Sequence, residues 1–174
     1  MSDEILAQLG RISASPKSFD ARGKWKRIVK RDRVSLQYDA PLSVDGRLEA
    51  GTSLMISAWE DAWEEDIYAQ ITASPFRTRS CRIDPVEWRP LHDHQNSFSG
   101  GSPYAGLTLS DRWHPFGLNA PLGIATFQQR ASGIAVPLPE PISNFDEMMV
   151  LCSRLWHFPD LTTIEPPPWS KPLL

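Results

Sequence analysis

The fold is decided by residues 54–72, LMISAWEDAWEEDIYAQIT, in which two alternating stretches flank an acidic connection. Apolar side chains recur at every second position from 54 to 58 and again from 67 to 71. A period of two places successive side chains on opposite faces of a strand. The stretch therefore predicts an antiparallel hairpin with one buried face.

The connection between the two stretches, residues 60–66, contains five carboxylates and no basic residue. This density of like charge disfavours burial, and it also disfavours edge-to-edge pairing with another strand. We therefore expect an exposed acidic turn.

Further strands are predicted on both sides of this hairpin. Val34, Leu36 and Tyr38 alternate with polar residues, and Asp45-Gly46 is typical of a two-residue turn. The basic stretch before them is either an exposed edge or part of one long bent strand. A short strand at 79–84 is expected to end at Pro85, and 124–127 and 133–136 are strand-like.

Helical spacing of apolar residues occurs near both ends of the chain. Residues 1–15 predict a short helix with one apolar stripe, and 144–157 predict a second helix that Asn144 caps and that has a broad apolar face. Four prolines in 162–174 predict an extended tail.

These elements predict an α+β fold with one antiparallel, twisted sheet or partly open β-barrel of about six strands. The C-terminal helix packs on the sheet, and the short N-terminal helix lies at its side. We expect a single domain, 1–174, made of the helix 1–15, a β-rich body 24–136, the helix 144–157 and the Pro-rich tail 162–174.

Composition restricts the location of the protein more than its function. The 174 residues carry a net charge of −3, which is too small to indicate a class of partner. There is no secretory signal pattern and no run of roughly 20 apolar residues. Cys81 and Cys152 are expected to be free thiols, since a disulfide would imply an oxidising compartment. We expect a cytoplasmic protein without membrane contact or cofactor, of undetermined oligomeric state.

The acidic turn is the first candidate binding surface. Trp59, Trp63, Glu64 and Glu65 could form an aromatic anchor surrounded by negative charge, as in a protein-binding hot spot. Alternatively, both rings fold back over the hairpin and only the carboxylates meet water.

The basic segment 17–33 is the second candidate, with eight Lys or Arg residues against two Asp. Lys24, Lys26 and Arg27 could follow phosphates while Trp25 stacks on a base, so contact with nucleic acid is possible. Alternatively, the charges protect an exposed edge from aggregation.

The third candidate is the segment 85–123, which holds three of the four histidines. His92, His94 and His114 would supply the acid and base of a metal-independent endoribonuclease, and Arg89, Arg82 or Arg112 would supply the cation. A metal site made by the His92-x-His94 pair with His114 or Asp84 is a weaker alternative. In the remaining interpretation these side chains only cap and hydrogen-bond the loop, and we expect no bound metal.

Order and spacing over residues 80–158 also carry a resemblance. Arg82-Ile83-Asp84, Pro90-Leu91-His92 with Asn96, Val136-Pro137-Leu138 and the helix at Phe145 resemble a family of small uncharacterised prokaryotic proteins. Those proteins are often carried on phages and mobile elements, so the resemblance implies a mobile-element or defence-related context. The chain departs from the family at Leu107 and Leu109, where a second histidine pair is usual.

Together these features favour a non-enzymatic interaction protein of bacterial or phage origin. It would bind a protein, or a protein–nucleic acid complex, in host–element conflict, for instance by inhibiting a defence system. The alternative is a small toxin-like endoribonuclease that uses the histidine and arginine cluster.

Overall fold

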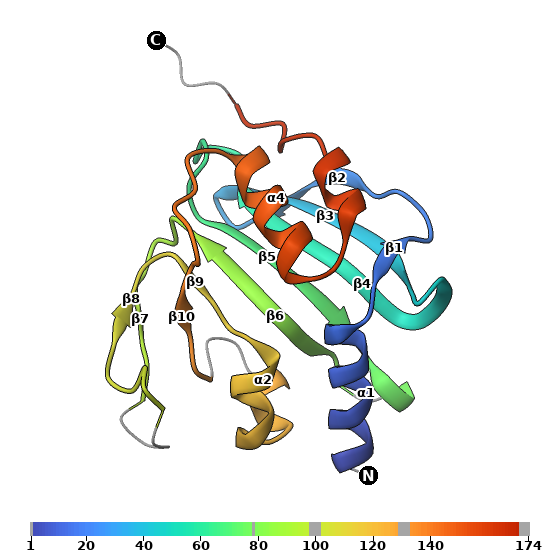
Figure 1. Ribbon diagram of the computed structural model, residues 1–174. Helices are drawn as coiled ribbons and strands as arrows, with labels where there is room; N and C mark the ends of the chain where they lie inside the picture. Colours follow the sequence, from blue (N-terminus) through green and yellow to red (C-terminus); the bar gives the residue numbers. More distant parts are fainter. Residues whose placement is uncertain (1, 78, 98–101, 129–132, 171–174) are drawn as a thin grey trace.

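One long antiparallel sheet dominates the computed structural model, which describes residues 2–77, 79–97, 102–128 and 133–170 (Figure 1). Its strand order is β1-β3-β4-β5-β6-β9-β10, and β2 pairs with β3 beside β1. The strands are β1 (Lys17–Phe19), β2 (Lys24–Lys30), β3 (Arg33–Val44), β4 (Arg47–Trp59), β5 (Ile67–Ala73), β6 (Cys81–Trp88), β9 (Arg112–Trp113) and β10 (Val136–Pro137). A separate hairpin consists of β7 (His94–Gln95) and β8 (Thr108–Leu109). The α+β prediction is confirmed, and the sheet is open, not closed into a barrel.

The helices gather on one face of this sheet (Figure 1). They are α1 (Ser2–Ala14), α2 (Phe116–Asn119), α3 (Ala125–Gln128) and α4 (Phe145–Leu155), with 3-10 turns η1 (Pro75–Arg77), η2 (Ala120–Leu122) and η3 (Pro159–Thr163). Each of the four α-helices packs apolar side chains against the same buried cluster. Asn144 caps α4, since its side-chain oxygen accepts a hydrogen bond from the Glu147 N–H at 2.9 Å.

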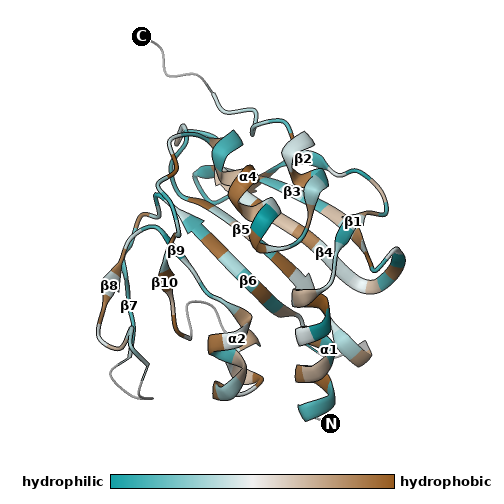
Figure 2. Ribbon diagram, viewed as in Figure 1, coloured by the Kyte–Doolittle hydropathy of each residue, from teal (hydrophilic) through white to brown (hydrophobic). Residues whose placement is uncertain are grey.

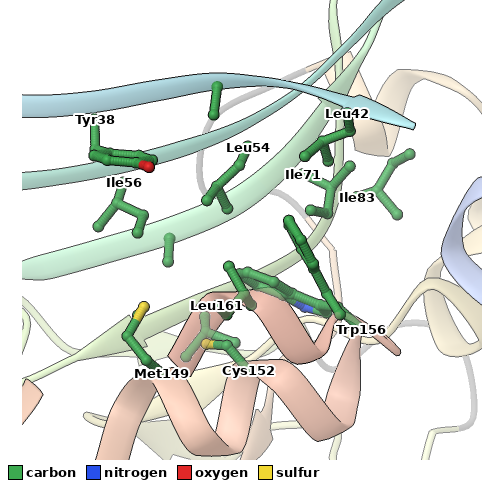
Figure 3. Packing of buried hydrophobic residues seen from close by; sticks show 14 of the residues in the cluster. Tyr38, Leu42, Leu54, Ile56, Ile71, Ile83, Met149, Cys152, Trp156 and Leu161 are labelled. Atoms are coloured by element: carbon green, nitrogen blue, oxygen red, sulfur yellow. The ribbon is translucent and has the colours of Figure 1, made fainter. Parts of the chain in front are cut away.

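The register places the core on the helix-covered face. One row of mutually opposed residues runs across the whole sheet there: Trp25, Tyr38, Ile56, Ala69, Val86, Trp113 and Val136. Brown apolar segments alternate with paler or teal ones along these strands in Figure 2. Figure 3 shows sheet residues such as Leu54 and Ile71 facing Trp156 and Leu161, all with no exposed surface. Their burial from water is the main stabilising term.

The adjacent row of residues points away from the helices and defines what we call the open face. Its members, from the edge strand β2 to β9, are Lys26, Gln37, Ser57, Tyr68, Glu87 and Arg112. Because all four helices contribute to the core on the other side, no α-helix of the described residues is left to cover this face. The sheet therefore presents a polar, charged surface.

Most predicted strands and both long helices are confirmed. Leu54 opposes Ile71 in the β4–β5 hairpin, and Asp45 and Gly46 both have positive φ in the turn between β3 and β4. The basic stretch is an exposed edge, because β2 turns at Arg31-Asp32 and pairs back onto β3.

Three predictions on the β-rich body are wrong. The strand β6 does not end at Pro85, because a bulge at Asp84, with φ 49°, lets the chain pass the proline and continue to Trp88. Residues 125–128 form the helix α3, since Phe127 turns into the core. The main sheet also has eight strands instead of about six, because the short β9 and β10 extend it.

The tail and the thiols follow the expectations where the structure describes them. Residues 164–170 run extended along the body, while 171–174 lie outside the described residues. Cys81 and Cys152 are buried and unpaired. Among the described residues, no helix has both the length and the apolar character needed to cross a bilayer.

Buried hydrogen bonds join the helices to the β6 bulge. The Asp84 carboxylate accepts hydrogen bonds from Ser13 Oγ at 2.5 Å and from the Phe116 N–H at 2.6 Å. Nearby, the Lys17 ammonium donates to the carbonyls of Ser13, Ser15 and Trp156. Burial lowers the pKa of Lys17 from 10.5 to about 8, although Asp84 opposes this shift. Burial raises the pKa of Asp84.

The depressed pKa of Lys17 predicts a specific pH dependence of stability. Between pH 8 and 10.5 the unfolded chain binds a proton at Lys17 that the folded chain does not, so stability rises with pH across this window. The wild-type free energy of unfolding, minus that of Lys17→Met, should therefore increase by about 3 kcal/mol over the window. Urea unfolding at stepped pH measures it.

The exposed Lys24→Met variant is the matched control, and its curve should stay parallel to the wild-type curve. A Lys17→Met curve that is also parallel would contradict the assignment.

Candidate functional site

The open face is hollowed around the ends of β2, β4 and β5. The hollow has a volume of about 220 Å³. Polar, aromatic and charged residues line it: Lys30, Ser35, Ser57, Ala58, Trp59, Asp66, Ile67, Tyr68, Glu87 and Pro90. Mixed linings of aromatic and converging polar groups are typical of binding sites.

Trp59 forms one wall of this hollow and is fixed in place. Its indole N–H donates to the Asp66 carboxylate at 2.6 Å. The Arg33 guanidinium lies 4.3 Å from its ring centroid and the Lys30 ammonium 5.8 Å from it. These cations favour the ring orientation that keeps Trp59 on the open face.

Glu87 connects the hollow to a buried polar cluster. Its carboxylate accepts a hydrogen bond from Arg112 at 2.6 Å and lies 3.4 Å from the His114 Nε2. Burial raises the pKa of Glu87, but the hydrogen bonds and charges of His114 and Arg112 outweigh it and hold this pKa below its ordinary value. Glu87 is therefore a carboxylate at neutral pH.

His94 completes this cluster. Its ring lies edge-on to that of His114, with 5.0 Å between the centroids. Its Nε2 lies 3.1 Å from the Asn96 side-chain oxygen. Burial lowers the pKa of His94, and His114 and Arg112 lower it further, so its imidazole is neutral at pH 7.

The two other residues of the predicted catalytic group lie elsewhere. His92 is exposed and contributes only its carbonyl, which accepts from Arg112. Arg89 covers the Trp88 ring and donates to the carbonyls of Glu64 and Ser143. Of the candidate cations, the structure thus joins Arg112, and not Arg89, to His94 and His114. In the described residues no three His, Cys, Asp or Glu side chains are placed to hold a metal ion.

Some residues of the acidic turn make contacts within the protein, and others are exposed to solvent. Trp63 is 46% exposed and stacks on Trp169 of the tail, with 6.0 Å between ring centroids. The Glu64 carboxylate accepts from the Phe145 N–H at the start of α4. Glu65 is exposed. Of the predicted anchor, Trp59 therefore belongs to the hollow, whereas Trp63 and Glu64 hold the tail and α4.

The basic segment divides between the two faces of the sheet. Lys24 and Lys26 are exposed on the open-face side, while Trp25 packs on the core side against Tyr38 and Phe145. Arg27 forms an ion pair with Glu60. The predicted alternation of phosphate-following cations with a stacking Trp25 ring is therefore not assembled on one surface. Lys17, at the start of the segment, is buried.

The sequence reasoning did not single out Glu87 and Tyr68. Both project onto the open face next to the predicted residues. The alternation that would have identified Glu87 is interrupted at the Asp84 bulge, after which the core position shifts from Ile83 to Val86. For Tyr68 the one usable signal was its position in β5, where it alternates with the buried residues Ile67 and Ala69.

Comparison with known proteins adds no family: no family model matches the chain, and neither a curated protein nor a solved structure matches it.

The buried pair of Glu87 and Arg112 predicts an asymmetric response to neutralisation. Glu87→Gln removes the charge that compensates the guanidinium of Arg112, which is 5% exposed, so it should destabilise the fold by about 3–5 kcal/mol. The same change at the exposed Glu65 should alter the free energy of unfolding by less than about 0.5 kcal/mol. Denaturant titration of the two variants at pH 7 measures both, and equal effects would contradict the role of the pair.

Proposed function

We propose that this chain is a non-enzymatic interaction protein that binds a protein partner through the open face of its sheet. The observation that carries the proposal is that the four α-helices of the described residues all pack on the opposite face, so the hollow on the open face is not covered by any of them. A cytoplasmic location and a role in conflict between a host and a mobile element belong to the same proposal.

The chemistry of the open face supports protein recognition. Trp59 and Tyr68 offer rigid aromatic surface, and aromatic residues with two side-chain torsions lose little conformational entropy on binding. Lys26 and Lys30 lie toward one side of this surface and Glu87 toward the other. A partner with complementary charge would therefore bind in one orientation.

An affinity-capture experiment with matched variants tests this proposal. Ser57 lies at the centre of the open face, so Ser57→Arg should obstruct the partner and reduce capture by at least about tenfold. Val150, which is 46% exposed on α4, provides the control Val150→Arg on the helix side. Quantitative mass spectrometry of proteins captured from the native host compares the three forms.

The proposal requires one partner that wild type and Val150→Arg retain and Ser57→Arg loses. A partner that Ser57→Arg retains, or that only Val150→Arg loses, would place the binding surface elsewhere.

A second candidate, cleavage of RNA, is favoured by the contact between the hollow and the cluster of Glu87, His114 and Arg112. In this candidate reaction the 2′-oxygen attacks phosphorus and the bond to the 5′-oxygen breaks. Glu87 takes the proton of the 2′-hydroxyl, His114 gives one to the leaving 5′-oxygen, and Arg112 offsets the charge on the phosphorane. Arg89 and His92 have no part in it.

RNA cleavage is tested with unmodified protein, because Glu87 and Arg112 also support the fold. A single-stranded RNA should be cut in EDTA to products with 2′,3′-cyclic phosphates, whereas an all-2′-deoxy strand of equal sequence should stay intact. His92→Ala should cut at the wild-type rate. Intact RNA, or equal cutting of both strands, would exclude this mechanism.

A further inference from the structure

We propose that the outer edge of β2 accepts an acidic, extended strand of a partner protein, which adds to the sheet beside β2. The inference rests on the proposed function, because it specifies how a partner approaches the open face. It commits to one partner class, a protein segment in β conformation that carries carboxylates.

The first argument is that β2 is the long free edge among the described strands. All seven residues of β2 pair with β3, and no other described strand pairs with β2. The other candidates are short or occupied. β10 is two residues long and ends in Pro137, while Lys17 and Phe19 of β1 donate their N–H groups to His157 and Asp160.

The second argument concerns the direction of the backbone groups of β2. A two-residue turn joins Lys30 to its opposite residue Arg33, and the closing pair of such a hairpin is hydrogen-bonded. The alternation along an antiparallel pair then directs the peptide groups of Arg27 and Val29 outward. Outside the β2–β3 ladder, neither N–H donates to a backbone carbonyl of residues 2–77, 79–97, 102–128 and 133–170. Both are available to an added strand.

The third argument is charge. Lys24, Lys26 and Lys30 are exposed and recur at even positions, so they share one face of β2. Pairing with a second copy of β2 would place lysines opposite or diagonal to lysines, which destabilises a cross-strand pair. A strand with carboxylates at alternate positions would instead form opposite-charge pairs. The lysines thus disfavour pairing between two copies of β2 and favour an acidic partner strand.

The two faces of β2 also favour a protein strand over a nucleic acid. Val29 is 75% exposed on the core-side face, where it offers an apolar contact to alternate side chains of an added strand. Trp25, the ring that could stack on a base, is packed against Tyr38 and Phe145 on that same side, away from the lysines. The lysine side of β2 therefore has no aromatic residue of its own strand on which a base could stack.

The test uses the full chain and a short blocked peptide that alternates glutamate and valine. Fluorescence anisotropy measures binding, and amide hydrogen exchange of Arg27 and Val29 reports strand addition. We expect both amides to exchange at least about tenfold more slowly at saturating peptide. Lys26→Glu should weaken binding by at least about tenfold, whereas Arg47→Glu, at the exposed far end of β4, should leave it unchanged.

Two control ligands separate strand addition from simple charge attraction. A peptide in which proline replaces each valine keeps the charge but cannot pair as a strand, so it should not slow exchange at Val29. Equal affinity for both peptides without slower exchange would overturn the inference. Tighter binding of a single-stranded oligonucleotide, again without slower exchange, would overturn it in favour of nucleic acid.

The experiment is independent of the test of the proposed function. If the peptide fails but Ser57→Arg still abolishes capture, the open face binds a partner without strand addition, and only this inference falls. If the peptide binds as expected but capture is unaffected by Ser57→Arg, the open-face proposal falls and the β2 edge remains an acceptor for acidic strands.

Discussion

The hydrogen bonds of Asp84 are the constraint on which the arrangement of the helices depends. Its carboxylate accepts from Ser13 at the end of α1 and from Phe116 at the start of α2, and its carbonyl accepts from the indole of Trp156 just after α4. Three helices are thus held in place by hydrogen bonds to one residue of β6. An internal carboxylate is tolerated only with such donors, because an unpaired buried charge is strongly destabilising. Lys17 lies close enough to add a favourable charge interaction.

The bulge at Asp84 explains why this arrangement leaves a surface for function. A regular strand would direct residues 84 and 86 to the same face, whereas the extra residue places both Ile83 and Val86 in the core row. The carboxylate can therefore meet the helices while Glu87 points to the open face. One irregularity in β6 thus separates a structural carboxylate from the candidate site.

The sequence predicted the regular part of this molecule because its signals are local. The alternation in residues 54–72, the Asp45-Gly46 turn and the cap of α4 by Asn144 each depend on neighbouring residues only. Pro85 was misinterpreted because a proline usually ends a strand, and only the bulge that precedes it permits the continuation. The helix α3 was missed because its single turn depends on the burial of Phe127.

The candidate site was harder to predict because its members meet through long-range pairing. His94 and His114 were expected to act together and do lie together, and of the candidate cations Arg112 joins them instead of Arg89, with the unpredicted Glu87. No spacing rule relates Glu87 to Arg112, since β6 and β9 pair across the whole β7–β8 hairpin. Long-range contacts also explain why some residues of the basic segment 17–33 are buried and others are exposed. The buried Lys17 ammonium, for example, needs the carbonyl of Trp156, far along the chain, in addition to the nearby carbonyls of Ser13 and Ser15.

The order of the strands has a consequence for the way the chain acquires its structure. From β2 to β6 each strand pairs with the next one in sequence, so these ladders close short loops. A growing chain could therefore form this meander in order of synthesis. The pairing of β9 with β6 and the docking of α4 must wait for later residues. Until α4 arrives, the part of the core that it covers remains open to water, and such a nascent stage is exposed to aggregation.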